Sequence, residues 1–120
     1  MRWVVCTSAL ALVLAGGTVG DAQPVAVSFE TLTVGTTAVG LATGTITPGS
    51  STDKVDLCRG RLEVAQVRYR DDGTAPTASV GLLLEVGDLI AIDGSDNITN
   101  FRAIRTGGTS GTLPIQCYRR

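Results

Sequence analysis

The sequence predicts an all-β fold: a small antiparallel β-sandwich, immunoglobulin-like or jelly-roll-like, with about six to eight short strands. Apolar and polar residues alternate over short runs separated by glycine-rich breaks. The 15 glycines and many threonines favour strands and tight turns over helices. After the first 22 residues no long segment has helical periodicity, and 120 residues suit one domain.

Residues 1–22 differ in composition from the rest of the chain. Arg2 precedes an apolar run, and Gly20-Asp21-Ala22 offers a cleavage site with a small residue on each side of Asp21. This order is typical of a secretory signal peptide, and the run is shorter than the roughly 20 residues that span a bilayer. We expect residues 1–22 to be a signal peptide or apolar leader, and residues 23–120 to form one β-sandwich domain. An uncleaved membrane anchor, an apolar arm that packs in an assembly, and a start codon set too far upstream are the alternatives for the leader.

The first strand is expected over residues 25–34, where apolar and polar side chains alternate up to a glycine. A second strand is expected over residues 38–47, although Gly40 and Gly44 interrupt it. Residues 48–53 have the composition of a loop.

The longest strand block covers residues 55–70, and Gly60 in its middle predicts a bulge or bend that splits it. Residues 71–77, DDGTAPT, are the strongest turn signal in the chain. The Asp-Gly pair supplies the positive φ that hairpin turns need. We therefore expect Asp72, Gly73 and Pro76 to have a structural role in this turn.

The remaining strands are short. The apolar runs 82–86 and 89–92 flank Gly87-Asp88 and predict a hairpin, followed by a turn at residues 93–97.

A last pair of strands is expected at residues 100–105 and 112–118, on either side of a glycine-rich loop. Because Pro114 has no backbone N–H, we expect its strand to have an edge there.

Two cysteines remain once the leader is set aside, Cys58 and Cys117. Each shares strand parity with two apolar residues: Leu62 and Val64 for Cys58, and Leu113 and Ile115 for Cys117. Both thiols can thus face one core, and an exported domain can keep a disulfide between them. Two buried free cysteines are the alternative.

The composition leaves little room for catalysis. The chain has no histidine, which excludes Ser–His and Cys–His nucleophile pairs and the commonest metal ligand. Two cysteines are too few for structural zinc. We expect no catalytic residue, no cofactor and no metal. A carboxylate pair such as Asp71 and Asp72, calcium at residues 93–97 and a glycosylation sequon at residues 97–99 are alternatives that local turn structure also explains.

Charge gives no warrant for specific nucleic-acid binding, because the net charge is −1. Nine of the ten basic residues are arginines. Four of them form a candidate contact face for another protein subunit: Arg68, Arg70, Arg102 and Arg105. A solvated sheet face whose arginines pair with neighbouring carboxylates is the alternative.

Three stretches together resemble a family of small tailed-bacteriophage virion structural proteins. They are VSFETLTVGTTAVGL (27–41), VRYRDDGTAPTASVGLLLEVGD (67–88) and NFRAIRTGGTSGTL (100–113). The resemblance covers nearly all of residues 27–120 and implies a virion or virion-accessory role without catalytic residues. The shorter segment YRDDGTAPTAS (69–79) is similar to a structural turn in immunoglobulin-like accessory domains of chitobiase-type enzymes, which implies a sandwich.

These observations predict a non-enzymatic structural or interaction protein, a virion component that decorates the head or serves as a head or tail accessory. The alternative is a secreted β-sandwich module that binds carbohydrate or a cell surface. The expected location is the virion, or a secreted or periplasmic one. The expected partners are copies of the chain or virion proteins in a homo-oligomeric or assembled state, with membrane contact through the leader alone.

Overall fold

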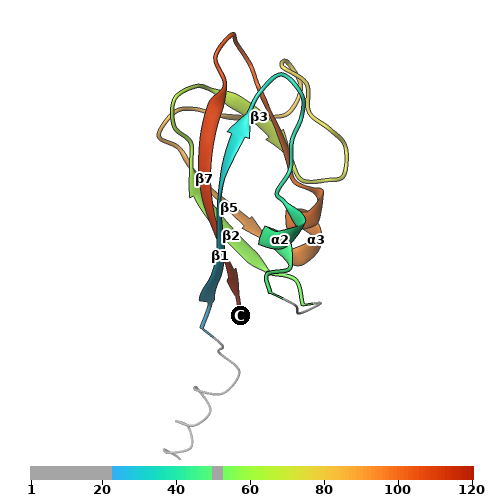
Figure 1. The fold of residues 1–120 in the computed structure, drawn as a ribbon. Helices are drawn as coiled ribbons and strands as arrows, with labels where there is room; N and C mark the ends of the chain where they lie inside the picture. The colour runs from blue at the N-terminus through green and yellow to red at the C-terminus, as the bar shows by residue number, and fades with distance from the viewer. Residues whose placement is uncertain (1–22, 50–52) are drawn as a thin grey trace, which may run out of the picture.

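A computed structural model describes residues 23–49 and 53–120, so the predicted leader lies outside the described residues. Within them, seven strands form two antiparallel sheets, which confirms the predicted all-β sandwich (Figure 1). Sheet A has the strand order β1-β7-β2-β5, and sheet B has the order β4-β3-β6. The strands are β1 (Val25–Val34), β2 (Leu57–Arg61), β3 (Val67–Arg70), β4 (Leu82–Leu84), β5 (Leu89–Asp93), β6 (Arg102–Arg105) and β7 (Gly111–Arg119).

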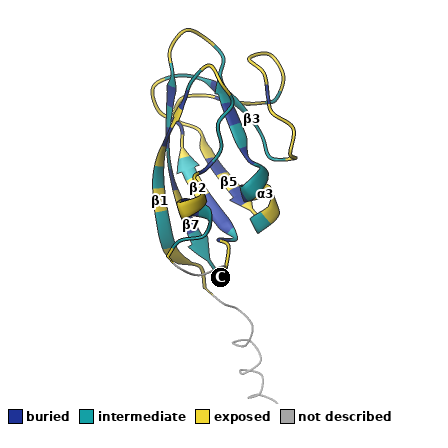
Figure 2. Cartoon of the chain, turned by 45° about the vertical axis from the view of Figure 1, so that its right-hand side comes forward, coloured by how far each residue is buried: buried dark blue, intermediate teal, exposed yellow. Residues whose placement is uncertain are grey.

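The core lies between the two sheets. Sheet B and two short helices, α2 (Thr43–Ile46) and α3 (Ser95–Asn100), pack against sheet A (Figure 2). The side chains buried there are almost all aliphatic, and Phe101 is the largest of them. Its ring packs at 5.8 Å from that of the half-buried Tyr69. Burial of this aliphatic set is the main stabilising contribution to the fold.

Both predicted C-terminal hairpins are wrong in the same way. β4 and β5 flank Gly87-Asp88 as expected, but β4 belongs to sheet B and β5 to sheet A. The glycine-rich loop 106–110 likewise carries the chain from β6 in sheet B to β7 in sheet A. Each connection therefore arches between the layers of the sandwich. Its strands bury residues such as Leu84 and Ile90 in the shared core.

The predicted strand at residues 38–47 is also wrong. Val39 makes one isolated bridge to Ala103, and the chain then forms helix α2. The carboxylate of Glu30, on β1, accepts hydrogen bonds from the Ala42 amide and the Thr45 hydroxyl, which fixes the helix over the inner face of sheet A. The turn expected at residues 93–97 leads into α3, which buries Ile98 in the core.

Gly60 does not mark a bulge. It pairs regularly with Ile115 on one side and Ile90 on the other, in the interior of sheet A. A Cβ atom at this position would lie 2.6 Å from the Pro114 carbonyl oxygen, so close strand approach explains the glycine.

The break in the 55–70 block falls instead after β2, in residues 62–66. There Val64 has a φ of 78° and is 62% exposed, so it does not share the buried face of Cys58 as expected. The Ala65 amide donates to the Glu63 carbonyl across it, which makes a γ-turn of the rare, strained form. This turn ends the strand alternation that would have put Val64 on the same face as Cys58.

Pro114 lies in an interior strand, which corrects the expectation of an edge. β7 is flanked by β1, where Pro114 faces Thr31, and by β2. The ladder between β2 and β7 stops at Gly60 and Ile115, directly before the proline is reached. The missing N–H therefore costs no bond in that ladder.

The disulfide between Cys58 and Cys117 is confirmed. The two residues are directly opposite each other on β2 and β7, with Cα atoms 4.0 Å apart, and both are fully buried. Leu113 and Ile115 share the buried face of Cys117 as predicted.

Candidate interaction surface

The predicted arginine face is divided by the pairing of β3 with β6. Arg70 lies opposite Arg102 and Arg68 opposite Ile104. Strand alternation therefore puts Arg68, Arg70 and Arg102 on the outer face of sheet B. Arg105 is opposite the buried Val67 and has the other parity, so it is not part of that face.

These arginines already have partners within the chain. Arg68 donates to the carbonyls of Ala78 and Gly81 at 3.2 and 2.8 Å, which holds the loop after β3 against the sheet. Arg102 donates to the Thr99 and Phe101 carbonyls at the end of α3. Their positive charges stay near the surface, but much of their donor capacity is used in fixing the neighbouring backbone. Contact with another subunit remains a prediction for this face.

Arg70 forms an exposed ion pair with Asp72. The guanidinium lowers the pKa of the Asp72 carboxyl, with a smaller contribution from the Thr74 amide, and the carboxylate in turn raises the pKa of Arg70. The pair is open to solvent, so its effect on stability is small.

The predicted structural turn is part of an eleven-residue loop between β3 and β4, residues 71–81. Gly73 has a φ of +90°, as the Asp-Gly signal predicts, and the Asp72 carboxylate accepts from the Thr74 amide. Pro76 is buried against Gly81. These contacts give the loop a fixed shape over the outer part of sheet B.

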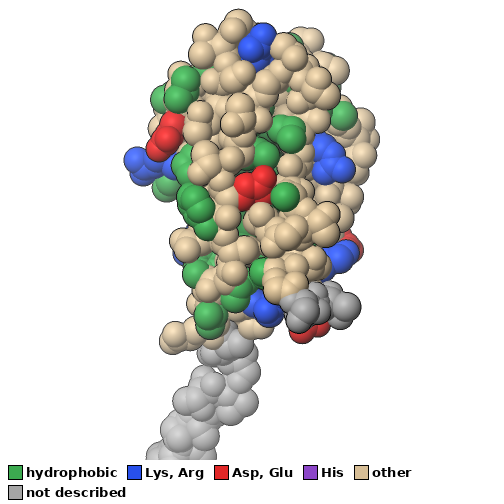
Figure 3. All heavy atoms as spheres, viewed as in Figure 1, with side chains coloured by type: hydrophobic (Ala, Val, Ile, Leu, Met, Phe, Trp, Pro, Cys, Tyr) green, Lys and Arg blue, Asp and Glu red, His purple; other side chains and the backbone are tan. Residues whose placement is uncertain are grey.

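A second surface, the outer face of sheet A, carries exposed hydrophobic side chains. Phe29, Gln116, Arg59 and Ala91 form one row across all four strands. Phe29 is 61% exposed on one edge strand, and Leu89 is 70% exposed on the other. Figure 3 shows hydrophobic side chains along the flank of the molecule where β1 and β7 lie.

A shallow hollow of about 300 Å³ lies beside the β5 edge of this face, lined by Arg59, Gly60, Leu89, Ile90 and Ala91. The Arg59 guanidinium lies over the Tyr118 ring with its carbon 5.4 Å from the ring centroid, within cation–π distance. The outer face of sheet A thus combines apolar residues with an arginine that lies over an aromatic ring. Surfaces of protein contact commonly have this composition.

Sequence reasoning missed this face because of an irregularity in β1. The pairing of β1 with β7 shifts register between Ala26 and Ser28, so Val27 is an inserted residue. Such a bulge moves the side chains beyond it to the other face of the sheet. Phe29 therefore points outward, although it continues the apolar alternation of Val25 and Val27 in the sequence.

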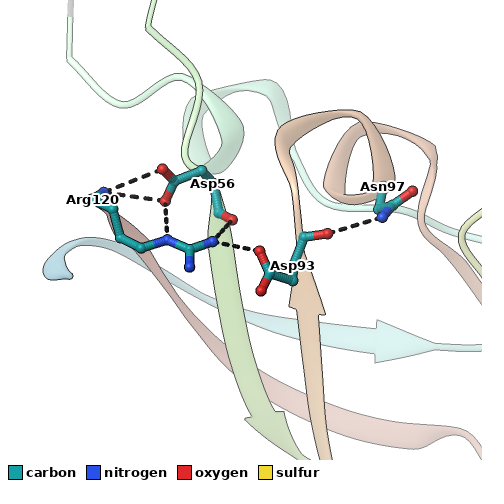
Figure 4. A network of polar contacts seen from close by, with 4 residues as sticks. All are labelled: Asp56, Asp93, Asn97 and Arg120. Carbon is teal, nitrogen blue, oxygen red and sulfur yellow. Dashed lines mark hydrogen bonds and ion pairs between the residues drawn. The ribbon is translucent and has the colours of Figure 1, made fainter. Parts of the chain in front are cut away.

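A network of polar contacts lies at the end of the domain that carries the C-terminal residue (Figure 4). The Arg120 side chain pairs with Asp56 and Asp93, which raises its pKa, Asp93 having the larger effect. Asn97 donates its side-chain amide to the Asp93 carbonyl. These contacts join the start of β2, β5, α3 and the C-terminal residue. They engage the carboxylate of Asp93, a candidate calcium ligand, and the side chain of Asn97, the candidate glycosylation acceptor.

No group of three or more potential metal-binding side chains occurs within residues 23–49 and 53–120. In the same part of the chain, no helix is long and apolar enough to cross a membrane. A scan against protein-family models and searches of the curated proteins and the solved structures found no match. The resemblance to phage virion proteins therefore stays a prediction from the sequence.

Proposed function

We propose that this chain is a non-enzymatic structural protein that assembles with other protein subunits as a component of a phage virion, in head decoration or as a head or tail accessory. The observation that carries the proposal is the outer face of sheet A. Its exposed Phe29, Leu89 and Ala91 lie on edge strands β1 and β5, with Arg59 and Gln116 between them. An exposed apolar face rimmed by polar residues marks a contact surface.

The virion assignment rests on the three sequence stretches that resemble tailed-phage structural proteins. The disulfide supports the proposal that the protein works outside the reducing cytoplasm, as a particle component or as a secreted or periplasmic protein. The buried bridge also stabilises a small domain whose core has few aromatic side chains.

Purified particles from the source that carries this gene test the proposal. We expect mass spectrometry to find the chain in the particle fraction at a fixed ratio to the major head or tail protein. Detection in the soluble fraction alone would contradict a virion role.

Two matched variants then identify the contact surface. Ala91→Glu adds a charge to the outer face of sheet A, and Leu83→Glu adds one to the outer face of sheet B. Both positions are exposed, so we expect both proteins to fold. Ala91→Glu should reduce incorporation into particles, whereas Leu83→Glu should not. The opposite result would assign the contact to the arginine face.

A further inference from the structure

We propose that β1 pairs with the β1 strand of a second copy of this chain, so that two A sheets join into one continuous antiparallel sheet. This rests on the proposed function, because it names the partner of an assembling subunit. Antiparallel pairing of identical edges obeys a two-fold axis, the symmetry of most protein dimers.

The first observation is the open edge of β1. It has ten residues and occupies the outermost position of sheet A. Within the described residues, β7 is the sole strand with which β1 pairs, and no backbone bond to a loop is present. Figure 2 shows β1 along the outline of the molecule, with no described segment beyond it. Its outward N–H and C=O groups are therefore a template for another strand.

The second observation is the lack of charge along this edge. β1 reads VAVSFETLTV, without lysine, arginine or proline, the residues that usually block edge pairing. Glu30 is its one charged residue, and the Glu30 carboxylate is occupied on the inner side by Ala42 and Thr45. Two β1 edges can thus approach each other without repulsion between like charges.

The other edges are less suited to pairing. β4 has three residues, and the backbone of β6 is partly closed by the two 2.9 Å bonds between Val39 and Ala103. β5 has five residues and ends at Asp93, whose carboxylate is paired with Arg120. Among the described strands, β1 offers the longest free edge.

One register suits the pairing best. A two-fold axis at Phe29, near the middle of the strand, overlaps almost its whole length. It places the two exposed Phe29 side chains opposite each other, and aromatic pairs are among the more stabilising cross-strand contacts. It also sets each Glu30 opposite Ser28 of the second copy, which keeps the two carboxylates apart.

One strand from each copy buries less surface than a standard interface, so we expect a dissociation constant in the micromolar range. At the high local concentration of an assembled particle, most β1 edges would be paired at this affinity.

Sedimentation velocity of the purified full-length chain, from low to high micromolar concentration, tests the pairing. The mass of the wild type should rise towards that of a dimer. Phe29→Lys should remain monomeric, whereas Leu89→Lys, the same change on the other edge of the same face, should behave as the wild type. A wild type that stays monomeric would overturn the inference, as would equal behaviour of the two variants.

A cysteine substitution tests the register and does not depend on tolerance of a charge. In a Cys6→Ser background, Phe29→Cys should form a covalent dimer on mild oxidation, because residues directly opposite each other are within disulfide reach. Thr33→Cys, on the same face but away from the axis, should not. Cross-linking of Thr33→Cys in place of Phe29→Cys would refute this register.

The outcome of the particle experiment is independent of the sedimentation and cross-linking results. A wild type that dimerises in solution but is absent from particles would contradict the proposed function and leave the pairing intact. A protein that is found in particles but is monomeric in solution would contradict the pairing and leave the proposed function intact.

Discussion

Strands β1 and β7 of sheet A have ten and nine residues, whereas no described strand of sheet B exceeds four. Sheet A is joined internally by the disulfide between β2 and β7. Sheet B lacks such a bridge, and its loops are held by arginine side chains and by a glycine with positive φ. The difference shows two ways to stabilise a sheet in a domain of this size: a covalent link from a long strand to its short neighbour, or loop contacts that support short strands.

Removal of the disulfide is the largest change expected in sheet A. Cys58→Ala with Cys117→Ala should lower the free energy of unfolding by about 4 kcal/mol, because the bridge closes a loop across 59 positions of sequence. Urea denaturation measures this, and reduction of the wild type should give a comparable loss. An unchanged midpoint, or no mass gain of two hydrogens on reduction, would contradict the bridge.

Gly60→Val tests the close strand approach in sheet A. The side chain would meet the Pro114 carbonyl and the Ile115 side chain, so we expect a loss of about 3 kcal/mol through overpacking. Gly108→Val in the 106–110 loop is the matched control, since nothing lies within 4 Å of its Cβ position. Equal melting temperatures for the two variants would show that β2 and β7 are not packed this tightly.

Gly73→Val tests the loop that supports sheet B. A β-branched residue is strained at a φ of +90°, and we expect a loss of about 1–3 kcal/mol in thermal denaturation. Gly73→Asn should lose less, because asparagine tolerates positive φ better. Equal melting temperatures for the valine and asparagine variants would show that the positive φ of residue 73 does not strain a β-branched side chain.

The smallest effect concerns alkaline pH and sheet B. Partial burial, and secondarily Asp71, raises the pKa of Tyr69 above its ordinary value near 10. The folded state therefore holds this proton more tightly, and stability should fall as pH rises beyond about 10, where the unfolded chain loses it first. Tyr69→Phe should flatten this slope in urea titrations at a series of pH values. A variant with the same slope would show that Tyr69 does not contribute.

The sequence predicted what depends on local alternation. The bounds of β1 and the inward parity of Cys58 and Cys117 follow from the period of two in a strand, and the structure agrees with both. The positive φ of Gly73 follows equally locally from the Asp-Gly pair.

The predictions that were wrong depend on how segments far apart in the sequence pack together. Gly87-Asp88 and residues 106–110 have the same composition whether they close a hairpin or arch between two sheets, so the sequence does not assign their strands to a layer. The outward position of Phe29 depends on a bulge that no glycine marks. The arginines were identified, but their carbonyl partners come from loops that only the folded chain brings near.

The pairing of Val25 with Arg119 has a mechanical consequence. β1 and β7 are the first and last of the described strands and are antiparallel neighbours, so tension applied between Val25 and Arg119 would open their hydrogen bonds one after another rather than all at once. β1 would peel away at low force, beginning at Val25. At the other end the pull would pass from Cys117 directly into Cys58, which prevents β7 from following. Under load the residues before Cys58 would lengthen, whereas the disulfide would keep residues 58–117 closed into a loop.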